Sequence, residues 1–598
     1  MDTDTKRSRY MTLLLAVAGL GGLLYGIDVG IIAGALPYLE ATSGLTANQL
    51  SVVVAAVLLG SVFSTLFAGM FADWMGRKRL MACSGLLFIM SIPLIALAHG
   101  YGPLVVGRLL QGMSAGLIGV VVPLYLAECL GASNRGKGTG MFQWLLTLGI
   151  VAAALIGLYF SFRVEEVAKL HDAGKLFAFK DSAWRLIFWV SLPPGILFVI
   201  GSLFVAESPR WLFRQGLKED ALAALLRSRS PQQAEVELGE MEATLIAEKA
   251  QADSKGKRHG ESLFSRKYVV PFILACVILA CNQATGVNSI IGYNATILIQ
   301  SGLSDKQAHL GYAVLTMVNF LMTMIGVMLV DRMGRKFLLS LGSAGIIVSL
   351  VAVGLVFRQT ERQRVDCAGA IQALVTPDQK ATFTFSEADA TRWLAGQGAA
   401  GEALRDQSKT LSVIYSYGDF RAASKVVRST DEGAKLELDR GSCVPPNKVV
   451  AFFANPFADL AAARIAPLKI ENALLTPIPS ERSGILTAVF IFCFMAFFAV
   501  GPGVCVWLAL SELMPTRIRS NGMSVALLLN QAVSTTIAVV FLPVVGKYGY
   551  GTMFFVFAAC TAAYFVTAAF FLPETKGKTL EEIEAHFERK RSARNRLK

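Results

Sequence analysis

Long apolar runs separated by short polar segments recur along this chain. About 20 apolar residues span a bilayer as a helix, and twelve runs approach or exceed that length. They cover residues 11–36, 50–71, 80–98, 103–128, 139–161, 185–206, 269–299, 308–330, 337–357, 484–511, 520–545 and 550–572. The pattern predicts an all-α membrane protein with twelve transmembrane helices.

Composition and charge support this interpretation. Hydrophobic residues make up 54% of the 598 residues and charged residues only 17%, against about 25% charged in soluble proteins. Lysine and arginine collect in loops that alternating helices place on one side: Lys6, Arg7, Arg9, Arg77, Lys78, Arg79, Arg135, Lys137, Arg332, Arg335, Lys336, Arg517 and Arg519. The positive-inside rule predicts a multi-pass cell-membrane protein with both termini cytoplasmic. Residues 359–483 contain no Asn-x-Ser/Thr sequon, which favours a bacterial inner membrane. The net charge of +13 then reflects topology, and we expect no nucleic-acid partner.

The first apolar run resembles a secretory signal at its start. Basic residues precede Leu13, but the run continues through Asp28 to Pro37 without a good processing site. We therefore expect it to remain as the first helix. The segment 162–184 is predicted to be an outward loop, although it carries several basic residues that acidic residues balance.

Three short polar motifs occur twice, at matching helix ends. Asp73–Lys78 resembles Asp331–Lys336, Glu128 and Arg135 are spaced like Glu512 and Arg519, and Glu207-Ser208 parallels Glu574-Thr575. Such a parallel repeat of two six-helix halves is typical of secondary transporters. The predicted parts are the first half (1–206), a cytoplasmic helical linker (207–268), the second half (269–358 and 484–572) and a cytoplasmic tail (573–598).

An insertion of about 126 residues makes the second half longer than the first. It occupies residues 359–483, on the outer side, and its pattern predicts a small α+β domain. Ser386 with Asp389 predicts a helix to about Arg405; residues 411–417 and 425–438 alternate like strands; and Asn455-Pro456 predicts another helix start. The insertion has no histidine, which excludes an internal Ser-His-Asp triad and histidine-based metal sites. We expect neither metal nor cofactor, and no enzymatic activity.

Two cysteines, Cys367 and Cys443, lie in the insertion. Because the outer side is oxidising, a disulfide between them is favoured over two free thiols.

One acid, Asp28, and one base, Arg108, lie in the interior of the apolar runs, away from their ends. Asp28 is about 12 Å from the outer end of its helix and Arg108 about 8 Å from the outer end of its own, at 1.5 Å per residue, so the two can meet. A static salt bridge is the alternative, but buried pairs are poor stabilisers. Intramembrane charges usually mark ion or substrate pathways, so the pair predicts proton coupling. Tyr25, one turn earlier, is either a relay or a packing residue.

Several strings together resemble the sugar porter family of the major facilitator superfamily. They are Gly21–Asp28, the two Asp-x-x-Gly-Arg-Lys loops, Gly107-Arg108, Pro123–Glu128, Glu207–Leu212, Gln283–Asn288, Gly501-Pro502-Gly503 with Trp507, and Pro573–Gly577. The resemblance covers the chain outside the insertion. It implies the major facilitator fold and sugar transport by alternating access.

The resemblance also implies a sugar site near the membrane midplane. Amide side chains suit a hydroxyl-rich sugar because they donate and accept hydrogen bonds at once. The implied residues are Tyr25, Gln143, Asn282, Gln283, Asn288, Tyr293, Asn319, Gly503, Trp507 and Asn530. For any single amide, a hydrogen bond between helices is the alternative. Asn282 and Gly292 replace a glutamine and a tyrosine that are common in the family, so the sugar itself is not carried over.

The loop motifs resemble the family's cytoplasmic gate, with solvated surface pairs as the alternative. The implied gate residues are Asp73, Arg77, Glu128, Arg135, Glu207, Asp331, Arg335, Glu512, Arg519 and Glu574. The sequence thus predicts proton-coupled monosaccharide uptake by a monomer. Facilitated diffusion and a sugar sensor acting through an outer partner of the insertion are the alternatives; the tail after Leu572, only 26 residues long, counts against a sensor.

Overall fold

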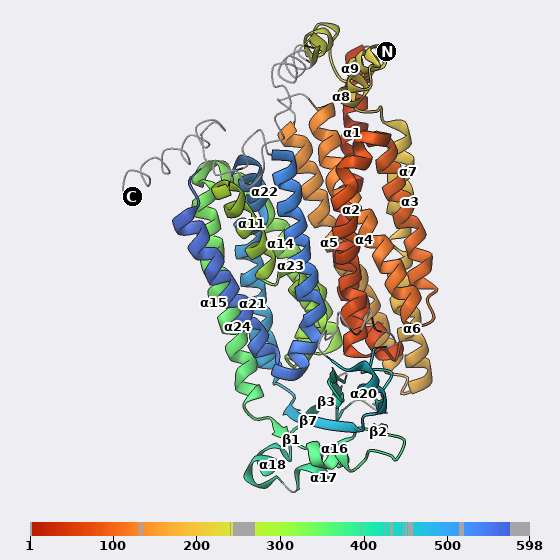
Figure 1. Cartoon of the computed structure of the whole chain (residues 1–598), viewed down its shortest axis with the longest axis vertical. Helices are drawn as coiled ribbons and strands as arrows, with labels where there is room; N and C mark the ends of the chain where they lie inside the picture. Colours follow the sequence, from red (N-terminus) through yellow and green to blue (C-terminus); the bar gives the residue numbers. More distant parts are fainter. Residues whose placement is uncertain are drawn as a thin grey trace.

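The computed structural model describes residues 3–130, 135–239, 241–242, 269–395, 397–424, 426–430, 435–445, 448, 451, 458–513 and 519–574. Within these residues, twelve helices are long and apolar enough to cross a membrane, which confirms the predicted number. The helices form a bundle with the insertion at one end (Figure 1). We call this end the insertion end, and the end that carries the Asp73–Lys78 motif the motif end.

The first half of the bundle comprises α1 to α7, with α8 and α9 following at the motif end (Figure 1). The bounds are α1 Thr3–Thr42, α2 Ala47–Met75, α3 Arg77–Ala96, α4 Tyr101–Cys129, α5 Arg135–Ala168, α6 Ala173–Trp189, α7 Leu192–Phe204, α8 Pro209–Arg214 and α9 Lys218–Leu226. Helix α1 packs on α5, and α2 packs on α4. Close approach depends on small residues: a Cβ added to Gly26 would lie 1.9 Å from the Leu146 carbonyl oxygen.

The second half repeats this arrangement with more breaks. Its helices are α11 Val269–Ala284, α12 Val287–Gly292, α13 Asn294–Gln300, α14 Asp305–Met333, α15 Arg335–Glu361, α21 Glu481–Val500, α22 Pro502–Leu513, α23 Arg519–Tyr548, α24 Tyr550–Val566 and the π-helical η1 Thr567–Phe571. The two halves meet where α2 packs on α23 and α5 on α14.

The predicted loop 162–184 is wrong. Helix α5 continues to Ala168, and Asp172 caps the next helix by accepting a hydrogen bond from the Lys175 backbone N–H at 3.0 Å. The residues between the two helices are only 169–172. Balanced charges on an exposed helix extension look like a loop in the sequence. The sixth span therefore begins at Ala173 and is divided near Pro193 into α6 and α7.

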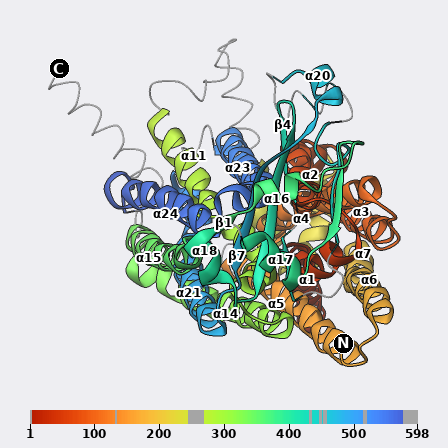
Figure 2. The ribbon, with the colours of Figure 1, turned by 90° about the horizontal axis from the view of Figure 1, so that it is seen from below.

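The insertion folds around antiparallel sheets with their own apolar core (Figure 2). The larger sheet has the order β1-β7-β3-β4, with β5 paired to β3, and the smaller sheet pairs β2 with β6. The strands are β1 Val365–Asp366, β2 Ala381–Thr384, β3 Lys409–Tyr417, β4 Phe420–Ala423, β5 Val427–Arg428, β6 Lys435–Leu438 and β7 Leu468–Pro477; the helices are α16 Ala368–Gln372, α17 Glu387–Leu394, α18 Gly398–Leu404 and α20 Leu460–Ile465.

The sequence predicted this α+β class and the strand 411–417, which lies within β3. Ser386 caps α17 as expected, accepting from the Asp389 backbone N–H, but the helix ends at Leu394 and α18 follows separately. The predicted strand 425–438 is two short strands, β5 and β6, in different sheets. The expected helix start at Asn455-Pro456 lies outside the described residues. The long strand β7 was not predicted.

The predicted disulfide is not formed, and both cysteines are free thiols. The Cys367 backbone N–H donates to the carbonyl of Ala473, a β7 residue that pairs with Val413 of β3. The Cys443 thiol instead lies 3.2 Å from the carbonyl oxygen of Phe420, a β4 residue that pairs with Tyr417 of β3. Four residues along β3 correspond to about 13 Å at 3.3 Å per residue, while a disulfide needs Cα atoms within about 7 Å. The strand register therefore separates the two thiols.

The insertion touches both halves of the bundle. Strand β4 packs against α2 and α23, and a Cβ added to Gly546 would lie 3.0 Å from the Cβ of Ala423. The Arg428 side chain donates to the Ile299 carbonyl at the end of α13. These contacts connect the second-half insertion to α2 of the first half.

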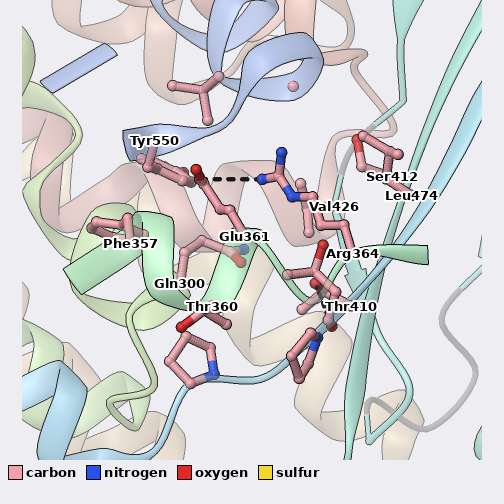
Figure 3. A pocket seen from close by; sticks show the side chains of 15 residues that line it. Gln300, Phe357, Thr360, Glu361, Arg364, Thr410, Ser412, Val426, Leu474 and Tyr550 are labelled. Atoms are coloured by element: carbon pink, nitrogen blue, oxygen red, sulfur yellow. Dashed lines mark hydrogen bonds and ion pairs between the residues drawn. The ribbon is translucent and has the colours of Figure 1, made fainter. Parts of the chain in front are cut away.

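A small cavity lies between the insertion and the second half. Its lining includes Glu361 and Arg364, which form an ion pair at 3.2 Å (Figure 3), and Thr410 and Ser412 of β3. The cavity volume is about 60 Å³, and one water needs roughly 10–15 Å³ on such a measure. The cavity thus suits a few waters rather than a sugar.

Candidate transport site

The charged pair predicted in the first half is brought together. Asp28 of α1 and Arg108 of α4 are 1% exposed, and the Arg108 Nη1 atom lies 4.0 Å from Asp28 Oδ1. This distance is too long for a hydrogen bond. Phe188 of α6 covers the guanidinium at 5.7 Å. The pair is therefore buried and close, but not hydrogen-bonded.

A glutamine that the sequence interpretation missed completes this cluster. Gln111 is fully buried on α4, and its Oε1 accepts a hydrogen bond from Arg108 Nη1 at 2.7 Å. The signal was present in the sequence, because residues three apart lie on the same face of a helix. Arg108 is thus hydrogen-bonded to the neutral amide of Gln111, although the carboxyl group of Asp28 lies only 4.0 Å away.

The second-half site is built on a break in the seventh span. Helix α11 ends at Ala284, Gly286 adopts φ +81, and α12 begins at Val287. A Cβ on Gly286 would lie 2.4 Å from the Phe557 ring, so this position requires glycine for both its backbone conformation and its space. Broken helices at membrane depth expose polar groups to a binding site.

Three predicted amides meet at this break. Gln283 Nε2 donates to Asn530 Oδ1 at 3.2 Å, and Asn288 Nδ2 donates to Gln283 Oε1 at 2.9 Å. Ser534 of α23, another residue that the sequence interpretation missed, accepts from Asn288 Nδ2 at 2.8 Å. It lies four residues after Asn530, on the same helix face. We call Gln283, Asn288, Asn530 and Ser534 the amide cluster.

Other predicted sugar residues lie outside the amide cluster. Asn282 donates to the Pro502 carbonyl at 3.3 Å, beside Gly503 at the start of α22. Tyr293 is fully buried, stacks on Phe541 and donates to the Ala538 carbonyl. Tyr293 thus has a packing environment in this conformation.

The residues that follow Gln143 and Asn319 lie at the contact between the halves. Each precedes an aromatic residue, Trp144 on α5 and Phe320 on α14, and these rings lie 5.8 Å apart. Asn319 is 9% exposed. The side chain of Trp507 lies outside the described residues.

Tyr25 faces the second half of the bundle. It is on α1, one turn before Asp28, and its hydroxyl faces Gln531 of α23, the residue after Asn530. Gln531 was not singled out in the sequence. Tyr25 of the first half therefore faces α23, the helix that carries Asn530 and Ser534.

The gate motifs of the first half form one connected network. Arg77 pairs with Asp73 at 2.9 Å and with Glu128 at 2.9 Å. Glu207 accepts hydrogen bonds from the Arg77 and Lys78 backbone N–H groups at 2.8 and 3.1 Å. This carboxylate fits because Gly76 has φ +92 and no side chain: a Cβ there would lie 2.3 Å from Glu207 Oε2.

The second half repeats this network. Glu574 accepts from the Arg335 and Lys336 backbone N–H groups at 3.1 and 3.2 Å, and Gly334 has φ +87 beside it. The networks described here join helix ends within a half. The side chains of Arg135, Asp331, Glu512 and Arg519 lie outside the described residues, so the predicted cytoplasmic gate stays a prediction.

The insertion end is closed by contacts between the halves. Tyr38 donates to Asp305 at 3.1 Å, Tyr312 donates to the Gly30 carbonyl at 2.9 Å, and Lys306 pairs with Glu165 at 3.1 Å. The His309 ring stacks on Tyr38 at 5.5 Å and its Nε2 lies 3.3 Å from the Gly34 carbonyl oxygen.

Two repeated six-helix halves around buried polar centres define a membrane transporter of the major facilitator fold. The chain belongs to the sugar (and other) transporter family, whose sequence profile matches residues 14–376 and 467–587. The unmatched segment lies within the insertion.

Known proteins resemble the chain over most of its length. The probable metabolite transport protein CsbC of Bacillus subtilis is 25% identical, covering 100% of this chain and 99% of that protein. The human proton myo-inositol cotransporter is 26% identical, and the match covers 97% of this chain and 82% of that protein. The inward-open structure of the xylose transporter XylE from E. coli shares the fold, with a TM-score of 0.63 and 20% identity, covering 96% of this chain and 98% of that one.

Proposed function

We propose that this transporter is a proton-coupled symporter that takes up a monosaccharide by alternating access. The observation that carries the proposal is the buried pair of Asp28 and Arg108, 4.0 Å apart on two membrane-spanning helices. Such charges are costly in a membrane and are usually retained for ion movement. A proton that binds Asp28 neutralises the acid, and its loss restores an ion pair with Arg108.

The amide cluster is the proposed sugar site. The amides hydrogen-bond to one another, and a sugar hydroxyl can replace each of these bonds because it both donates and accepts. Tyr25, one turn before Asp28, faces Gln531 of α23, the helix that carries Asn530. Sugar binding and protonation therefore act on neighbouring groups of opposite halves, as coupling requires.

The proposed orientation places the motif end in the cytoplasm, following the distribution of basic residues. The insertion end then faces outward and is closed by Tyr38, Asp305 and the neighbouring contacts. We accordingly assign this conformation to the inward-facing part of the cycle. The human relative named a proton myo-inositol cotransporter supports proton coupling and a polyhydroxylated substrate.

The test is uptake of a panel of labelled monosaccharides and inositols into proteoliposomes. We expect at least one monosaccharide to accumulate above its external concentration when the outside is acidic, and to equilibrate only when the proton gradient is collapsed by an ionophore. Equal plateaus with and without the gradient for every transported sugar would contradict symport and indicate facilitated diffusion.

A further inference from the structure

The Arg108 side chain has two competing partners, and the structure shows it bonded to the neutral one. Its Nη1 atom is 2.7 Å from Gln111 Oε1 but 4.0 Å from Asp28 Oδ1. Arg108 and Asp28 are each 1% exposed and Gln111 is fully buried, so solvent does not compete for these bonds. In water-excluded surroundings an arginine would strongly prefer an ionised carboxylate to an amide.

The carboxyl group of Asp28 shows the complementary property. Among the described residues, neither of its oxygens has a hydrogen-bond partner, and the same holds for Gln111 Nε2. An ionised carboxylate buried without hydrogen bonds is very costly. The arrangement therefore suits a protonated Asp28, with Gln111 satisfying the guanidinium that the neutral acid no longer holds.

We propose that Gln111 is a positioning residue that holds Arg108 while Asp28 is protonated and releases it when the proton leaves. On deprotonation, the Arg108 Nη1–H bond to Gln111 Oε1 breaks and a bond to Asp28 Oδ1 replaces it, while the proton departs to water. The exchange needs a movement of about 1 Å, the difference between 4.0 Å and an ordinary hydrogen-bond length of 2.9 Å. Gln111 thereby sets how readily the coupling site gains and loses its proton.

Among the residues that the structure describes around the pair, few other groups can play this part. Arg108 and Gln111 come from α4, Tyr25 precedes Asp28 on α1, and Phe188 of α6 covers the guanidinium. From α14, Tyr312 faces α1 one turn away and is committed to the Gly30 carbonyl. Helix α5 approaches α1 through Leu146, Gly149 and Ile150, which carry no charge.

The inference rests on the proposed symport, and two variants with opposite expected effects test it. Gln111→Leu removes the neutral partner, so Arg108 pairs with Asp28 and favours its ionised form. We expect the pH of half-maximal proton-driven uptake to fall by about one unit, a tenfold increase in the proton concentration required. Gln111→Glu gives Arg108 a permanent anionic partner and places negative charge near Asp28, so the same midpoint should rise.

Ser114→Ala is the matched control, because Ser114 lies one turn further along α4, is buried, and donates only to the Ser84 carbonyl at 2.7 Å. Its midpoint should equal that of the wild type. Sugar exchange at equal concentrations on both sides, measured for every variant, reports folded protein. Gln111→Glu is nearly isosteric and still offers Arg108 a hydrogen-bond acceptor. It therefore provides a test of the proposal even if Gln111→Leu does not fold.

Three outcomes are distinguishable. Opposite midpoint shifts with preserved exchange support the inference. Unshifted midpoints in both variants, with wild-type accumulation intact, would overturn the role of Gln111 and leave the symport proposal standing. Failure of the wild type to accumulate sugar under a proton gradient would remove the proposed function, and this inference with it.

Discussion

At the residue scale, the proposed site consists of a few polar side chains held by unusual local geometry. The break at Gly286 turns Gln283 and Asn288 toward Asn530, and the crossing of α1 and α4 places Asp28 beside Arg108. Each amide is already hydrogen-bonded to another amide or to backbone. Geometry alone is therefore compatible with both binding sugar and joining helices.

Alanine substitutions separate these two roles. Gln283→Ala, Asn288→Ala and Asn530→Ala should each weaken sugar binding by about 1–3 kcal/mol, the usual cost of leaving a polar partner unpaired. Isothermal titration of purified protein with the transported sugar measures the change. Thr535→Ala serves as control, because that hydroxyl bonds only to the Gln531 carbonyl of its own helix. Unchanged sugar affinity in all three variants, with lowered melting temperatures, would assign the amides to helix packing.

The same scale shows how far the sequence predicts the site. Asp28, Arg108 and three of the amides were identifiable because polar groups in apolar runs demand an explanation. Gln111 and Ser534 were not identified, since an amide or hydroxyl beside a stronger motif looks like ordinary packing. Tyr293 was expected at the sugar, but its ring is stacked on Phe541 in this conformation.

At the element scale, the helices were predictable and the insertion only partly so. Lipid requires each span to be a long apolar helix, which makes the runs easy to recognise. Strand pairing depends on distant residues, and so the register that separates Cys367 from Cys443 was not visible. Strand β7 pairs with β3 across the insertion, yet its own ten residues carry no decisive pattern.

A buried lysine in the insertion predicts a pH dependence of stability. Lys409 is fully buried at the start of β3 and donates to Glu387 at 2.5 Å. Partial burial raises the pKa of Glu387, but the hydrogen bonds from Lys409 and Ser429 outweigh this effect and lower the pKa below its usual 4.5. A depressed pKa in the folded state stabilises the fold above about pH 4.5, and this contribution is lost as the pH falls through the folded-state pKa.

Glu387→Gln should therefore lower the thermal unfolding temperature of the insertion in the full-length protein at pH 7. The difference from wild type should shrink below pH 4.5, where wild-type Glu387 also becomes neutral. Glu402→Gln, at an exposed position on α18, provides the control and should behave like wild type. A constant difference between Glu387→Gln and wild type from pH 7 to pH 4 would contradict this account of the pair.

At the scale of the whole molecule, the insertion lies at one end of the bundle and contacts both six-helix halves. It is joined to the second half through α15 and α21, yet β4 packs against α2 of the first half. Alternating access moves the halves relative to each other. Opening of the insertion end must therefore separate β4 from α2, whereas Asp28 and the amide cluster lie deeper in the bundle.

Replacing residues 365–478 with a short Gly/Ser linker tests this arrangement. We expect a folded, membrane-inserted transporter whose accumulation ratio under a proton gradient is unchanged, because that ratio is set by the coupled site. The initial rate of uptake should change, because the contact with α2 is gone. A monodisperse truncated protein that no longer binds sugar would instead make the insertion part of the site.

Asp28 is the proposed carrier of the coupled proton, and one substitution tests this role directly. Asp28→Asn removes the titrating group but keeps its size, and the measurement compares two assays of this variant in the same proteoliposomes. We expect Asp28→Asn to lose sugar accumulation driven by an inward proton gradient, while exchange of labelled sugar between equal concentrations is partly retained. Full concentrative uptake by Asp28→Asn would contradict this role.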